Sequence, residues 1–231
     1  MKTIIGKSYL IKIPHEGGKL IFKYPGFMKN SCNLAEKIDK EGLKRPNSSE
    51  TASLVHNSWK NPKEKYSSEI INLLTYSAVL EFTGNLYLKK SKLNKEINNG
   101  VILDLNSQAL KFDEDRKLIM DKNSLIKRLE LNDPLVKFVP FGTYKIGEQT
   151  IKELEKNKYV VARYGEEGAE KIAEIASNYK EKFFVDNFIF RKGEEIARMS
   201  CLDGYFSFDD RLIIGYDYYA NNYRALGICK K

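Results

Sequence analysis

The chain contains few of the residues that build metal centres and disulfide frameworks. Its 231 residues include 3 cysteines and 2 histidines. The odd number and wide separation of Cys32, Cys201 and Cys229 argue against a disulfide framework or a zinc site. We expect these cysteines to be reduced and buried. Neither the His-Glu-x-x-His and Cys-x-x-Cys spacings nor the EF-hand spacing occurs. The sequence therefore predicts no bound metal ion and no cofactor.

The sequence patterns of common catalytic sites are also missing. There is no Gly-x-x-x-x-Gly-Lys-Ser/Thr loop, no Gly-x-Gly-x-x-Gly fingerprint and no Gly-x-Ser-x-Gly elbow. A serine or cysteine nucleophile would need His15 or His56 as its base. His56 lies at helical spacing from Ala52, which favours a place on a helix at the edge of the core. We expect no enzymatic activity, and a hydrolase that uses His56 is the alternative.

No apolar run approaches the eighteen or so residues that cross a membrane, and a lysine at position 7 interrupts the apolar N-terminal stretch. We therefore expect neither a membrane span nor a signal peptide, and a cytoplasmic or virion-associated location. The formal net charge is +8, but the lysines are scattered. Scattered lysine is typical of a solvated surface, so nucleic acid is not the expected partner. A basic nucleic-acid-binding or virion structural protein is a further alternative.

The hydrophobic patterns predict an α+β protein formed by residues 1–231 as one domain, without repeats or linkers. Two capping boxes, Asn47 with Glu50 and Thr150 with Glu153, predict helix starts. The predicted helices cover 34–39, 47–60, 67–78, 123–130, 150–157 and 166–179. A hairpin is predicted within 2–24, and further strands at 82–88, 101–105, 137–140, 159–163, 183–190, 196–202, 213–214 and 225–229.

Residues 203–223, here called the aromatic window, differ in composition from the rest of the chain. They contain no Lys, Glu, Gln, Met or Trp, although these five types make up roughly a quarter of the sequence. Aspartate and asparagine are interspersed with the aromatics, a composition typical of antibody paratopes. The aromatic residues are Tyr205, Phe206, Phe208, Tyr216, Tyr218, Tyr219 and Tyr223.

Two interpretations of the aromatic window are possible. Phe206 and Phe208, at i and i+2, fit the core face of a strand. The tyrosines lie among Asp, Gly and Asn, which favour loops and are costly to bury, so an exposed binding surface is the favoured interpretation. The window contains four aspartates and a single positively charged residue, Arg211, so it would repel phosphate.

The layout resembles the variable protein of a diversity-generating retroelement, of the archaeal or archaeal-virus type. In that family a reverse transcriptase mutates template adenines, which turns AAC codons into NNC. That codon set cannot encode the five residue types that the aromatic window lacks. The resemblance covers roughly residues 47–231 and includes the stretches Val139–Gly142, Gly147–Thr150 and Tyr164–Lys171.

The resemblance implies a C-type lectin-like fold with elaborations, in which the N- and C-terminal strands pair. A strand within residues 2–13 would then lie beside Ala225–Cys229, and Leu212–Ile214 would be a buried strand between two variable loops. It implies a hypervariable surface that binds a protein or glycan ligand. The implied contact positions are Asp203, Tyr205, Ser207, Asp209, Asp210, Tyr216, Tyr218, Tyr219, Asn221, Asn222 and Tyr223.

Two departures limit what the resemblance implies. The glycine- and tryptophan-rich signature of the sulfatase-modifying lectin-fold subgroup is absent, so that enzyme's chemistry is not implied. The Glu-Pro-Asn and Trp-Asn-Asp motifs of calcium-dependent lectins are absent too, so sugar binding through calcium is not implied.

Overall fold

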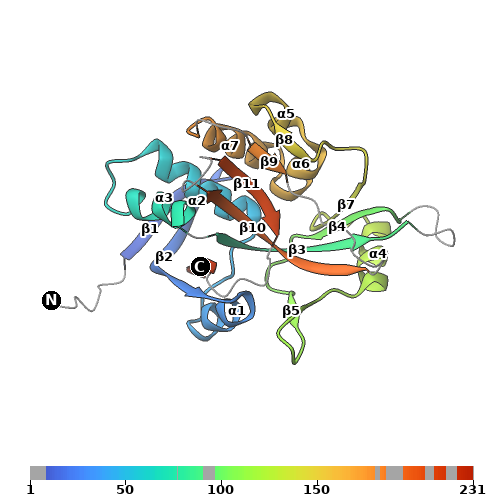
Figure 1. The fold of residues 1–231 in the computed structure, drawn as a ribbon. Coiled ribbons are helices and arrows are strands. Elements are labelled where there is room, and N and C mark those ends of the chain that lie inside the picture. The colour runs from blue at the N-terminus through green and yellow to red at the C-terminus, as the bar shows by residue number, and fades with distance from the viewer. Residues whose placement is uncertain are drawn as a thin grey trace.

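A computed structural model describes residues 9–76, 78–90, 97–179, 183–185, 195–205, 211–216 and 223–230 (Figure 1). The helices are α1 (Ser31–Lys40), α2 (Ser48–Lys60), α3 (Ser67–Tyr76), α4 (Lys122–Glu130), α5 (Ile151–Lys156), α6 (Lys158–Tyr164) and α7 (Glu166–Ala176). The strands are β1 (Tyr9–His15), β2 (Gly18–Lys29), β3 (Val79–Leu88), β4 (Gly100–Asp104), β5 (Lys111–Phe112), β6 (Leu118–Ile119), β7 (Val136–Pro140), β8 (Gly147–Gln149), β9 (Phe183–Val185), β10 (Ile196–Tyr205), β11 (Arg211–Tyr216) and β12 (Tyr223–Ile228).

Ten of the described strands form one mixed sheet in the order β1-β2-β12-β3-β10-β11-β9-β8. Strand β3 is at its centre: β10 pairs along one side of it, while β12 and β4 pair with its beginning and its end on the other side. Strand β7 continues this second branch by pairing with β4. A separate small sheet contains β5 and β6. The α+β prediction is confirmed.

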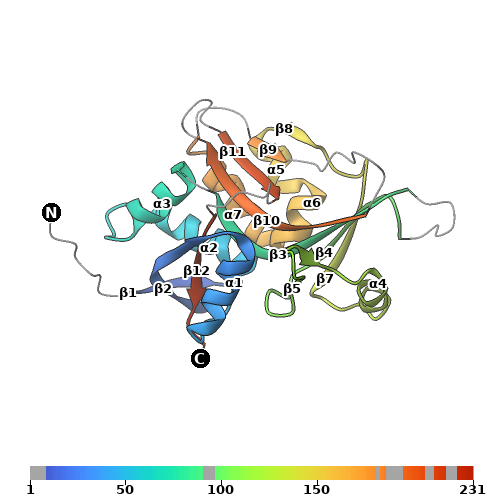
Figure 2. The ribbon, with the colours of Figure 1, turned by 60° about the horizontal axis from the view of Figure 1, so that its bottom comes forward.

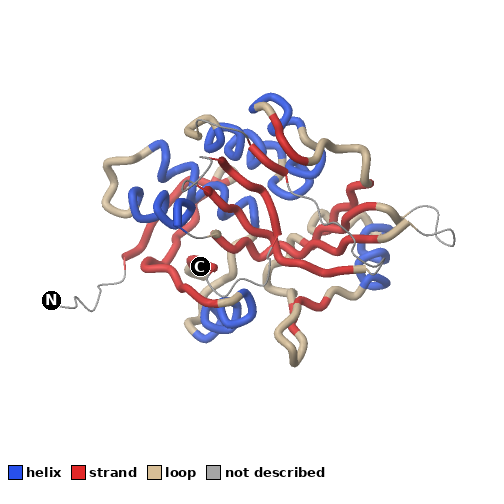
Figure 3. The backbone as a smooth tube through the Cα atoms, viewed as in Figure 1, coloured by secondary structure: helices blue, strands red, loops and turns tan. Residues whose placement is uncertain are grey.

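Successive side chains of β3 point to opposite faces of the sheet, and both faces are buried. Val79 and Tyr87 face a main core covered by α2, α3, α5, α6 and α7. Leu80 and Phe82 face a second core under α1, and Leu86 contributes to a third under α4. The sheet therefore lies between two helical layers, which can be followed in Figures 2 and 3.

The C-terminal strand pairs with the N-terminal hairpin, as predicted, but with the second strand of the hairpin and not with the first. Strand β12 lies beside β2, with Ala225 opposite Phe27, and β1 pairs only with the far side of β2. The prediction that a strand within residues 2–13 lies beside Ala225–Cys229 is therefore wrong. The hairpin turns at Glu16 and Gly17, and its longer second strand is the one that pairs with β12.

Two helix starts, those of α2 and α5, follow the predicted capping boxes. Both capping boxes are present, at Asn47 with Glu50 and at Thr150 with Glu153. The strand predicted at 159–163 is wrong, because these residues belong to α6. The Asn157 side chain accepts the Tyr159 N–H at the start of this helix, and Gly165, with a φ of 75°, ends it.

The buried positions of α6 explain the error in that prediction. Tyr159, Val160, Arg163 and Tyr164 are buried, which is a helical spacing. Over seven residues such a stripe resembles an apolar strand.

Candidate ligand-binding surface

The described residues of the aromatic window belong to three strands. Asp203 and Tyr205 end β10, Tyr216 ends β11, and Tyr223 begins β12. Strands β10 and β11 are antiparallel neighbours, with Tyr205 opposite Arg211, so residues 206–210 join adjacent strand ends. The other seven predicted contacts lie outside the described residues, and nothing is described of the Tyr205 and Tyr216 side chains. These seven are Ser207, Asp209, Asp210, Tyr218, Tyr219, Asn221 and Asn222.

Asp203 is the predicted contact whose surroundings are described most fully. It lies directly opposite Ile213 of β11, and both side chains are half-buried. Burial raises the pKa of the Asp203 carboxyl above its ordinary value. A half-buried carboxyl selects among ligands more strictly than a fully hydrated one. A ligand that covers it must supply hydrogen bonds to the carboxyl to offset the loss of its remaining water.

Leu212–Ile214 form a strand, as predicted. Leu212 and Ile214 are fully buried in the main core, whereas Ile213 points to the opposite face and is half-buried. The backbone of β11 is thus fixed by two apolar anchors, while one face of the β10–β11 pair stays partly open beside Asp203.

Tyr223 is a core residue, so the prediction of an exposed side chain at this position is wrong. Only 2% of it is exposed, and it belongs to the second core, with Leu34 and Ile38 of α1. Its location follows from strand pairing. The N–H of the next residue, Arg224, donates to the Ala78 carbonyl (3.0 Å), and β12 lies between β2 and β3. Tyr223 therefore anchors the end of the aromatic window in the core and is not an exposed contact.

A buried arginine holds β10 and β11 together. Arg163 of α6 is 1% exposed. Its guanidinium donates to the carbonyl of Cys201 (2.9 Å) and to the carbonyl of Gly215 (2.9 Å). Cys201 and Gly215 are opposite each other in the β10–β11 ladder. One side chain thus fixes both strands that lead into residues 206–210.

Glu81 of β3 is the charge partner of Arg163. The pair is fully buried, and the Ser48 hydroxyl (3.1 Å) and the Tyr164 hydroxyl (3.1 Å) also donate to the same carboxylate oxygen. Burial alone would lower the pKa of Arg163, but the Glu81 carboxylate raises it well above its ordinary value. The arginine is therefore charged and depends on Glu81. We call Arg163, Glu81 and the two carbonyls the arginine clamp.

A further chain of hydrogen bonds extends the arginine clamp across β3 and β10. The Tyr159 hydroxyl donates to Asn85 Oδ1 (2.8 Å), and Asn85 Nδ2 donates to Ser200 Oγ (2.9 Å). Arg163 Nη1 reaches the Tyr159 hydroxyl at 3.4 Å. Buried polar groups of this kind fix one geometry, because each lost bond would leave a desolvated group unpaired.

Close packing at Gly204 fixes the end of β10. A Cβ at this position would lie 2.4 Å from the Tyr179 hydroxyl and 3.0 Å from the Leu74 carbonyl. Only glycine permits this approach of α3 and Tyr179 to the strand. Sequence analysis missed Gly204, Arg163 and Glu81 as determinants of the site. For Arg163, a charged residue inside the short apolar run 159–164 was the available signal.

The histidines take structural roles. His56 Nε2 lies 2.6 Å from Glu174 Oε2, and Lys60 pairs with the same carboxylate at 2.8 Å, which ties α2 to α7. His15 Nδ1 contacts the Ser53 hydroxyl at 2.9 Å, and burial lowers the pKa of His15. In the described part of the chain no group of three or more His, Cys, Asp or Glu side chains could hold a metal ion.

Comparisons with known proteins identify the fold. No family model matches the chain, and no curated protein matches it. A solved structure described as "Accommodation of massive sequence variation in Nanoarchaeota by the C-type lectin fold" is similar, with a TM-score of 0.60 and 14% identity. The similarity covers 89% of this chain and 98% of that one. Within the described ranges no helix combines the length and apolarity needed to cross a bilayer. The chain has a C-type lectin fold.

Proposed function

We propose that the protein is a non-catalytic display protein, the variable protein of a diversity-generating retroelement. Its constant frame holds a hypervariable surface that binds a protein or glycan ligand. The proposed contacts are those on and between β10 and β11, and those between β11 and β12. They are Asp203, Tyr205, Ser207, Asp209, Asp210, Tyr216, Tyr218, Tyr219, Asn221 and Asn222.

The observation that carries this proposal is how the arginine clamp grips the aromatic window. Arg163 and Glu81 lie outside residues 203–223, and within the described part of the window the hydrogen bond of the clamp goes to the carbonyl of Gly215. Every amino acid carries a carbonyl, so the clamp is indifferent to side-chain identity there. A frame that holds its display strands by main-chain atoms tolerates extensive substitution.

The support residues inside the window are compatible with the proposed mutational mechanism. Gly204, Leu212, Ile214 and Tyr223 are fixed by packing, and all four types belong to the NNC codon set. Binding would bury tyrosine rings and use Asp and Asn for hydrogen bonds at the rim. The ligand would meet the protein in the cytoplasm or on a virion.

The DNA around the coding sequence provides the test. We expect an adjacent reverse-transcriptase gene and a near-copy of the segment that encodes residues 203–223, differing only where the copy has adenine. Sequencing the whole coding sequence in independent isolates should then show changes at the proposed contacts and none at the codons of Arg163 and Glu81. Substitutions scattered evenly over both regions would contradict the proposal.

A further inference from the structure

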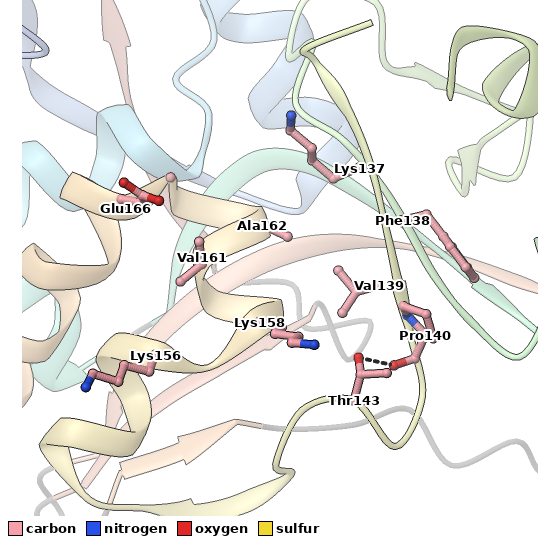
Figure 4. A pocket seen from close by; sticks show the side chains of 11 residues that line it. Lys137, Phe138, Val139, Pro140, Thr143, Lys156, Lys158, Val161, Ala162 and Glu166 are labelled. Atoms are coloured by element: carbon pink, nitrogen blue, oxygen red, sulfur yellow. Dashed lines mark hydrogen bonds between the residues drawn. The ribbon is translucent and has the colours of Figure 1, made fainter. Parts of the chain in front are cut away.

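A groove outside the aromatic window lies between β7 and α6 (Figure 4). Its volume is about 710 Å³, within the range typical of ligand sites. Val139 of β7 and Val161 and Ala162 of α6 provide an apolar floor. We call this the lysine groove, because Lys137, Lys156 and Lys158 also line it.

The three lysines give the groove a positive charge. All are exposed, and among the described residues none of them forms an ion pair. Glu166 is the one acidic residue among the described residues that line the groove. Lys137 and Lys158 come from opposite walls (Figure 4). An occupant with negative charge would therefore be held from both sides.

The wall formed by β7 is a strand edge with which no described strand pairs. In the antiparallel pairing with β4, the Leu105 N–H donates to the Leu135 carbonyl (2.8 Å) and the Phe141 N–H to the Asn99 carbonyl (2.8 Å). Hydrogen-bonded and non-bonded pairs alternate, so residue 138 turns its N–H and C=O away from β4. The Phe138 ring points away from the groove, which leaves its main chain on the groove side (Figure 4).

Two neighbouring groups on this edge, the Val136 N–H and the Pro140 carbonyl, already have hydrogen-bond partners. The Val136 N–H donates to the Asp133 carbonyl (3.1 Å), and the Pro140 carbonyl accepts from the Thr143 hydroxyl (2.8 Å). Proline also lacks an N–H. No described strand pairs with the outward N–H and C=O of Phe138, and an added extended segment uses such groups when it joins a sheet edge.

We infer that the lysine groove binds an extended acidic peptide segment of a partner protein. Its main chain would pair with Phe138, its acidic side chains would meet Lys137 and Lys158, and its apolar side chains would cover Val139 and Val161. The groove lies outside residues 203–223, so this attachment would stay constant while the displayed surface changes.

Fluorescence anisotropy with the full chain tests this inference. The probe is a labelled nonapeptide of alternating valine and glutamate, and the same peptide with lysine in place of glutamate is the control probe. We expect saturable binding of the acidic peptide only. In Lys137→Glu/Lys158→Glu the dissociation constant should rise at least about tenfold. No binding of the acidic peptide at about 1 mM would overturn the inference.

Two controls separate this site from general attraction to a basic protein. Lys12→Glu/Lys63→Glu changes the net charge equally at exposed lysines outside the groove, and should change affinity less than about twofold. N-methylation of alternate peptide residues should abolish binding through loss of main-chain hydrogen bonds. Equal losses in both double variants, undiminished binding of the methylated peptide, or tighter binding of an oligothymidine that depends on Lys137 and Lys158 would each overturn the peptide assignment.

Discussion

The β10–β11 pair and the frame around it are held by different kinds of contact. The frame depends on particular side chains: Arg163 needs Glu81, and Tyr159 needs Asn85. The strand pair is held through its carbonyls at Cys201 and Gly215 and through a few apolar anchors. Side-chain identity is therefore restricted in the frame and at the buried positions of the pair, whereas Asp203 and Ile213 are only half-buried. The proposed display function requires such a frame, which would stay folded while exposed side chains change.

The largest effect is expected from breaking the arginine clamp. Arg163→Met should lower the free energy of unfolding by about 3–5 kcal/mol, because it leaves the Glu81 carboxylate buried without its charge partner. Urea denaturation measures this. The double variant Arg163→Met/Glu81→Leu should lose less than the sum of the single losses, since no lone charge remains. Wild-type stability in the single variant would refute the role of the clamp.

A comparison of two tyrosines in the aromatic window sharpens the distinction between support and display. Tyr223→Ser should cost about 3 kcal/mol, because it opens a cavity in the core beside Leu34. Tyr218→Ser, at a proposed contact, should change stability by less than about 0.5 kcal/mol. Thermal denaturation of both variants, side by side, gives the result. Similar costs at the two positions would mean that the proposed display surface is itself part of the core.

A smaller effect is expected at the base of the β10 end. Gly204→Ala should cost about 1–3 kcal/mol, because the new methyl group would meet the Tyr179 hydroxyl and the Leu74 carbonyl. Gly204→Ala/Tyr179→Phe should recover part of this loss by removing the hydroxyl. Chemical denaturation of the wild type, the two single variants and the double variant isolates the contact between position 204 and the Tyr179 hydroxyl. If the losses of unfolding free energy in the single variants add up in the double variant, the contact is contradicted.

The smallest effect concerns the frame alone and depends on pH. Burial lowers the pKa of His15, so folding favours its neutral form. This contribution is present above the ordinary pKa of about 6.5 and is lost as the pH falls below it towards the lower folded value. His15→Asn should therefore lose less stability than the wild type between pH 7.5 and pH 5.5. Denaturation midpoints of the wild type and the variant are measured at both pH values. If the midpoint changes by the same amount in the two proteins, this contribution is excluded.

Local signals in the sequence predicted the elements that end in well-defined caps and turns. Asn47 with Glu50 started α2, and Glu16-Gly17 turned the N-terminal hairpin. The short run at 158–164 gave the wrong element, because one buried helical stripe of two turns has no distinct period. The α+β class could be predicted without knowledge of long-range contacts, because local patterns were enough to recognise both strands and helices.

The candidate site was less predictable because it depends on contacts between distant residues. Glu81 and Arg163 are 82 positions apart, and neither carries a local motif. Tyr223 lies in a polar, loop-like sequence, yet the pairing of β12 with β2 and β3 places it in the core. Strand register in a sheet this large is a tertiary property, so composition alone could not separate support from display.

The most direct test of the central claim compares two libraries of the full chain. In one, the codons for positions 207, 209, 210, 218, 219, 221 and 222 are replaced by NNC. In the other, NNC replaces the codons of seven frame residues: Ser48, Glu81, Asn85, Tyr159, Arg163, Tyr164 and Ser200. Protease resistance of displayed clones is measured for both. We predict that most clones of the first library stay folded and almost none of the second do; equal survival would contradict the account.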